Sequence, residues 1–120
     1  MKLSEREWTV LNALWETEEA ELGTLVNELY ENTGWSRNTV LTYLTRMEAK
    51  GLVRIDKDTY PHTYHATLDR ESCQQQERQN FLHRVYSGST GDLIAAFLKE
   101  EPISQEERER LRKILDNMEV

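Results

Sequence analysis

The chain has a single cysteine, no long apolar run and fewer positive than negative charges. One thiol, Cys73, cannot form an internal disulfide or a metal site built from several cysteines, so a free thiol on a helix is the simplest interpretation. No segment approaches the roughly 20 apolar residues that cross a bilayer. The start MKLSEREW also lacks the basic and apolar regions of a secretory signal. These absences predict a cytoplasmic protein.

The sequence also lacks the common signatures of catalysis. It contains no glycine-rich phosphate loop, no nucleophile elbow and no HExxH pair. With 120 residues, 38% of them hydrophobic, it can bury one modest core or a small core with a helical appendage. We therefore expect a protein that is not an enzyme and that has neither a small-molecule substrate nor a cofactor.

Positive charge is concentrated in one segment, residues 36–57. Five Lys or Arg stand there against two Asp or Glu, whereas the whole chain has 15 against 22. A protein that reads a polyanion needs positive charge on the element that reads it. The segment therefore suggests DNA as a partner, but its surplus is too small for avid non-specific binding, so two copies are expected to act together.

Periodic apolar residues predict three helices, at about 4–16, 22–32 and 36–51. Ser4 with Glu7 fits a capping box, and Ser36 fits the N-cap of the third helix. After the third helix the period changes to the alternation of strands, first around Val53 and Ile55 and again around Tyr64 and Ala66. Three helices followed by a β-hairpin describe a winged helix-turn-helix domain, expected over residues 1–68.

Residues 69–120 predict a second, helical domain. Positions 69–80 are nearly all polar, so a helix there is solvated, and the later helices are short with narrow apolar stripes. Such helices cannot close a core alone, and pairing with a second copy is the commonest solution. The residues expected to form this dimerisation surface are Phe81, Val85, Leu93, Phe97, Leu111, Ile114 and Leu115. The predicted fold class is mainly α with a small β-hairpin wing and a C-terminal helical dimerisation domain.

The third helix is the candidate recognition helix. Val40, Leu44 and Met47 share one side, and short polar residues with Arg46 occupy the other. Arg pairs with guanine and Asn with adenine, and a Thr methyl meets that of thymine. Residues at the helix ends and on the wing, where Lys57 and His62 also lie, are better placed for phosphates. The residues assigned to DNA are Arg37, Asn38, Thr39, Thr42, Arg46, Lys50, Arg54 and Tyr64.

Metal binding has little support in the sequence. His62 and His65 are close in sequence, but on a strand they would point to opposite faces. We therefore expect no metal site.

The chain resembles the penicillinase and methicillin-resistance repressor family over nearly its whole length. The resemblance is carried by LSEREWTVLNALW at the start, WSRNTVLTYLTRMEAKGLV across the third helix, the Tyr64 strand, and DLIAAFLKEEPISQEERERLRKIL near the end. The copper-responsive branch of the same family is similar in its DNA-binding half, but it carries paired cysteines near the C-terminus that LRKILDNMEV lacks.

The resemblance implies a homodimeric repressor that binds palindromic operators of the TACA and TGTA type and so blocks transcription. In such proteins the pattern found here at Arg37, Asn38, Thr39, Thr42 and Arg46 supplies the major-groove contacts. The family's induction mechanism implies cleavage between Ala96 and Phe97 after a membrane sensor protease detects a β-lactam. A winged helix that binds another protein instead of DNA remains the alternative.

Overall fold

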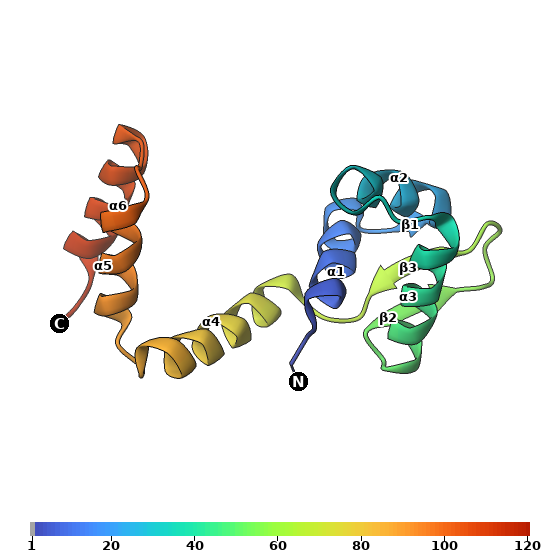
Figure 1. Cartoon of the computed structure of the whole chain (residues 1–120), viewed down its shortest axis with the longest axis horizontal. Helices are drawn as coiled ribbons and strands as arrows, with labels where there is room; N and C mark the ends of the chain where they lie inside the picture. Colours follow the sequence, from blue (N-terminus) through green and yellow to red (C-terminus); the bar gives the residue numbers. More distant parts are fainter. Residues whose placement is uncertain (1) are drawn as a thin grey trace. The chain divides into compact units, whose positions relative to one another are not determined.

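The computed structural model describes residues 2–120, and its elements follow the predicted order (Figure 1). The elements are α1 (Glu5–Thr17), β1 (Ala20–Glu21), α2 (Leu22–Thr33), α3 (Arg37–Ala49), β2 (Val53–Asp56), β3 (Thr63–Ala66), α4 (Arg70–Tyr86), α5 (Thr90–Glu100) and α6 (Gln105–Asn117). Three helices with a hairpin make a winged helix-turn-helix domain, and further helices follow it. The predicted fold class, mainly α with a small β-hairpin wing and a helical C-terminal part, is confirmed.

Local sequence signals set the ends of the first three helices. The Ser4 hydroxyl accepts from the Glu7 backbone N–H, and the Glu7 side chain accepts from the Ser4 backbone N–H, which completes the predicted capping box. The Ser36 hydroxyl accepts from the Thr39 backbone N–H at the start of α3. Gly51 has φ +80°, a left-handed conformation that glycine adopts without a Cβ clash, and it turns the chain from α3 towards β2.

The sheet has three antiparallel strands in the order β1-β3-β2. In the hairpin, Ile55 lies opposite Tyr64. The strand β1 was not predicted, because two residues are too few for an alternating pattern. It pairs with β3 through Ala20 and Tyr64, and so connects the start of α2 to the wing.

The core lies between α1, α2, α3 and the sheet. It consists of small and medium apolar side chains from each of these elements: Val10, Leu11, Ala13, Leu14, Ala20, Leu25, Leu29, Val40, Leu44, Met47, Leu52, Val53 and Tyr64. Burying a Val, Leu or Met side chain contributes roughly 1.5–3 kcal/mol. The same packing fixes the rotation of each helix about its own axis.

Glu7 is the one charged residue among the buried residues that the structure describes, with 9% of its surface exposed. Its Oε1 accepts from the Ser4 backbone N–H at 2.8 Å, and its Oε2 accepts from Lys50 Nζ at 2.9 Å. The backbone hydrogen bond from Ser4 and the hydrogen bond from Lys50 lower the pKa of Glu7 below its ordinary value. The beginning of α1 is therefore joined to the end of α3 through a single carboxylate.

The chain divides into two compact units within α4, the first ending at Glu77 and the second beginning at Arg78. The first turn of α4 belongs to the first unit. There Arg70 Nη2 donates to Glu16 Oε1 at 2.7 Å, and its guanidinium lies 5.8 Å from the Trp15 ring centroid. The predicted domain division at residue 68 falls before these contacts.

The second unit exposes most of its apolar side chains. No residue of α5 or α6 is buried in the part of the chain that the structure describes. Large exposed apolar side chains from α4 onward are Val85, Ile94, Phe97, Leu98, Ile103, Ile114, Leu115, Met118 and Val120. Phe97, for example, is 59% exposed.

Within residues 2–120, no helix has the length and apolar character needed to cross a membrane.

Glu7→Gln is expected to lower the free energy of unfolding by about 1 kcal/mol at pH 7, because the neutral amide loses the ion pair with Lys50. The ionised carboxylate stabilises the fold above the ordinary pKa of 4.5, and this contribution is lost as the pH falls through the lower pKa of the folded state. Denaturation curves for both proteins at pH 7 and at about pH 3 should therefore differ less at the acidic pH.

Glu5→Gln is the matched control, because Glu5 is exposed in the same helical turn and carries the same charge. Its effect on unfolding is expected to be small at both pH values. An equal loss in the two variants would contradict the assigned role of Glu7.

Candidate nucleic-acid interface

The orientation of α3 follows from its buried side. Val40 and Leu44 are fully buried and Met47 nearly so, and their spacing places all three on one side of the helix. The opposite side is left at the surface. We call four of its residues the polar face of α3: Asn38, Thr39, Thr42 and Arg46.

The polar face lines a shallow hollow of about 200 Å³ together with Tyr43. The Thr42 hydroxyl donates to the Asn38 carbonyl within the helix at 2.8 Å, so its methyl group and its lone pairs remain for a partner. Arg46 makes no ion pair with any residue that the structure describes. A guanidinium that is charged and uncommitted can form bidentate hydrogen bonds with a base edge.

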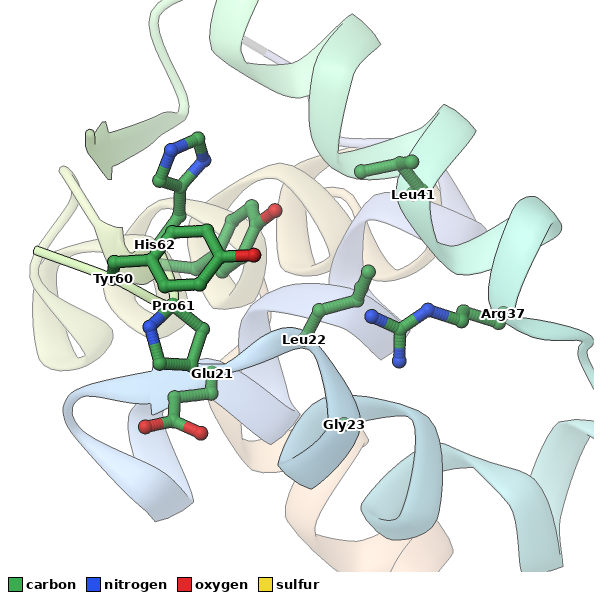
Figure 2. A pocket seen from close by; sticks show the side chains of 9 residues that line it. Glu21, Leu22, Gly23, Arg37, Leu41, Tyr60, Pro61 and His62 are labelled. Carbon is green, nitrogen blue, oxygen red and sulfur yellow. The ribbon is translucent and has the colours of Figure 1, made fainter.

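Arg37 lies on another flank of α3. A notch of about 460 Å³ lies between α3, the start of α2 and the loop that joins β2 to β3, and Figure 2 shows the side chains that line it. Arg37 and Leu41 lie on its helix side, and Tyr60 and His62 lie on its loop side. Unlike the polar face, Arg37 shares a notch with the wing loop. This position suits a contact with a backbone phosphate at the edge of a DNA groove.

Both lysines in the basic segment are paired with acids of the same unit. Lys50 pairs with Glu7 at 2.9 Å, and Lys57 pairs with Glu48 at 3.6 Å. Arg54 on β2 is exposed, and no ion pair to it occurs among residues 2–120. The positive charge that is free for a new partner therefore lies mainly on arginines.

Tyr64 is almost entirely buried, although it is among the residues that line the notch beside Arg37. Only 4% of its surface is exposed, and it packs in the core opposite Ile55. Burial raises the pKa of its hydroxyl, the positive charge of Arg37 opposes this shift, and Glu48 adds to it. Tyr64 is thus mainly a core residue that holds the wing against the helices, and its assignment to DNA contact stays a prediction.

Tyr43 and Arg6 also belong to this surface, although the sequence did not predict either of them there. The Tyr43 ring lies 4.8 Å from the ring of Trp35, and the guanidinium of Arg6 lies 5.9 Å from the Tyr43 centroid. Tyr43 follows Thr42 at the edge between the buried and polar sides of α3. The division of α3 into an apolar and a polar side therefore does not assign Tyr43 to either. Arg6 comes from α1, and the sequence gives no sign that it approaches α3.

Among the residues that the structure describes, no group of three or more His, Cys, Asp or Glu side chains is placed to hold a metal ion. His62 precedes β3 and lies in the loop, whereas His65 lies within the strand. The expectation that the two point to opposite faces of one strand therefore does not apply.

Comparison with known proteins places these features in a family. The family model described as penicillinase repressor matches residues 3–117. The methicillin resistance regulatory protein MecI of Staphylococcus aureus is 30% identical over 115 residues, which cover 96% of this chain and 94% of that protein.

Two penicillinase repressors are also similar along nearly the whole length. The one from Staphylococcus aureus is 25% identical over 118 residues, covering 98% of this chain and 94% of that protein. The one from Bacillus licheniformis is 26% identical over 115 residues, covering 96% and 90%. Because the family match spans the winged helix-turn-helix and the C-terminal helices together, the chain belongs to the penicillinase repressor family.

Proposed function

We propose that the protein is a transcriptional repressor that inserts α3 into the major groove of operator DNA. The observation that carries the proposal is the polar face of α3, where short side chains surround the uncommitted guanidinium of Arg46. The major groove is about 12 Å wide and admits one α-helix. Short polar side chains allow the helix to approach the bases closely.

The chemistry of the polar face suits direct reading of bases. Arg46 can donate two hydrogen bonds to a guanine, and Asn38 can pair with an adenine; each good pair discriminates by roughly 1–3 kcal/mol. Thr39 and Thr42 offer methyl groups to thymine. Arg37 and Arg54 flank this face and suit phosphates, which set the register of the helix without reading sequence.

We propose that the repressor is a homodimer paired through α4, α5 and α6. Exposed Phe97 and Leu115 belong to a unit whose α5 and α6 bury no residue in the described chain. Apolar surface of this kind is costly in water and is commonly covered by a two-fold copy. The dimerisation surface consists of the seven residues Phe81, Val85, Leu93, Phe97, Leu111, Ile114 and Leu115.

A two-fold dimer matches a palindromic operator. We propose that the operator is of the TACA and TGTA type. We also propose that the protein binds it in the cytoplasm. The relatives are named for methicillin resistance and for penicillinase, so genes of β-lactam resistance are the proposed targets of this chain.

We also propose that induction proceeds by cleavage between Ala96 and Phe97, by a membrane sensor protease. Both residues lie in the C-terminal half of α5. Proteases bind extended chain, so the helix must open first. Within one chain α5 buries no side chain, so it opens at low cost once the pairing of the two copies is released. Cleavage would separate part of the dimerisation surface from the DNA-binding domain.

A selection from random duplexes at about physiological salt tests the function. We expect the wild-type protein to recover a two-fold symmetric site. The Arg46→Ala variant should bind that site more weakly by roughly 1–3 kcal/mol and lose preference at one position in each half-site. If the wild type recovers no common site, a winged helix that binds another protein is favoured. If Arg46→Ala loses the same affinity on every DNA sequence, Arg46 contacts only phosphate.

Leu115→Asp is expected to yield monomers that bind the operator at least about tenfold more weakly, because a charge placed in the dimerisation surface cannot be buried without a partner. Sedimentation equilibrium measures the mass. Lys113→Asp is the control, since it places the same side chain on the opposite side of α6. A Leu115→Asp dimer with the wild-type dissociation constant would contradict the proposed surface.

Co-expression with a sensor protease of the family and a β-lactam is expected to produce a fragment that ends at Ala96, identified by mass spectrometry. Intact wild-type protein under these conditions would argue against induction by proteolysis and leave DNA binding untouched.

A further inference from the structure

A groove of about 720 Å³ runs between the first turns of α1 and the C-terminal half of α3. Three cations line it, Arg6, Arg46 and Lys50, against two acids, Glu5 and Glu7. Arg46 also lines the hollow beside the polar face. The groove is therefore continuous with the surface proposed to contact bases.

Arg6 is held in place without being neutralised. Its guanidinium lies 5.9 Å from the Tyr43 ring centroid, and Tyr43 itself packs on Trp35. Arg6 forms no ion pair with the residues that the structure describes. A cation over an aromatic ring keeps its N–H donors at the edge of the guanidinium plane. Arg6 thus presents an ordered positive charge at the side of α3.

Lys50 is held in a different way. Glu7 Oε2 takes one of its three ammonium donors at 2.9 Å, and the Glu7 carboxylate is fixed in turn by the Ser4 backbone N–H. The Lys50 side chain remains 62% exposed, so its other donors face solvent. The carboxylate orders the ammonium, and the exposed side of that ammonium can still bind an anion.

We infer that Arg6 and Lys50 together bind one backbone phosphate of the DNA strand next to the bases that α3 contacts, with Glu7 as a positioning residue. This inference rests on the proposed function and adds a contact from α1 to it. A phosphate suits the groove because it accepts hydrogen bonds from both cations at once. The groove lies beside the polar face, where the backbone of a duplex bordering the major groove would run.

The salt dependence of binding by the full-length protein is the first test. Each phosphate contact contributes about 0.9 to the slope of log K against log salt. Arg6→Gln should therefore lower that slope by about 2 for a dimer, with equal fractional loss on the selected operator and on an unrelated duplex. Arg78→Gln, an exposed arginine on α4 that lines neither the groove nor the hollow, should leave the slope unchanged.

Ethylation of individual phosphates identifies the contact. Ethylating one phosphate in each half-site should weaken binding of the wild type, and the same modification should no longer matter to Arg6→Gln or to Lys50→Gln. If Arg6→Gln and Lys50→Gln lose interference at two different phosphates, the two residues do not share a contact. The proposal also fails if both variants keep the wild-type interference pattern.

The two proposals can fail separately. If the wild type selects no duplex, the proposed function fails. If the wild type selects a site and Arg6→Gln retains the full salt slope with an unchanged melting temperature, only the phosphate contact fails. Tighter binding of an acidic peptide than of DNA in this groove, abolished by Arg6→Gln, would likewise overturn the assignment to DNA.

Discussion

The burial of one side of α3 is the constraint on which the proposed function depends. Val40, Leu44 and Met47 are enclosed between α1, α2 and the sheet, so α3 cannot rotate about its axis without exposing them. Their burial is worth several kcal/mol. A rotation of the helix by about half a turn would bring the polar face to the core. The hydrophobic core therefore decides which side chains reach a partner, although none of its residues touches one.

Charge is used sparingly on this acidic chain. The pairs Lys50–Glu7 and Lys57–Glu48 neutralise or restrain two of the five cations in the basic segment. The more exposed of the two, Lys57–Glu48, is expected to contribute little to stability. Their stronger effect is to order the lysines. A protein with few free cations binds random DNA weakly, so sequence-dependent contacts account for a larger share of its affinity.

The sequence was sufficient to predict the elements that have regularly spaced apolar residues and a capping residue. Ser4 with Glu7, Ser36 and Gly51 marked helix ends correctly, and the spacing of Val40 and Leu44 identified the buried side of α3. The strand β1 was missed because two residues have no period. The deep burial of Tyr64 was not predicted, because strand alternation shows which residues share a face, but not which face is covered. That depends on β1 and the helices, which are distant in sequence.

The site was less predictable than the fold for a related reason. Arg6 and Lys50 lie far apart in the sequence, and their meeting depends on how α1 crosses α3. Glu7 could be predicted as a cap, yet its second role, holding Lys50, needs the tertiary structure. Pairwise contacts between distant segments carry no local signal, and on this surface they determine which charges are free.

The proposed dimer joins two DNA-binding domains that each bind DNA weakly. Each DNA-binding domain offers few free cations and one recognition helix, so a single domain gains little from its contacts. When the C-terminal helices hold two domains together, the second one binds at a high effective concentration, and the affinity can rise by orders of magnitude without any new contact. The same arrangement makes the C-terminal unit a sensitive point of control. Its α5 and α6 bury no residue in the described chain, so in the proposed dimer the pairing would cover their apolar side chains. Any event that opens α5 removes the pairing and, with it, the advantage of the second domain.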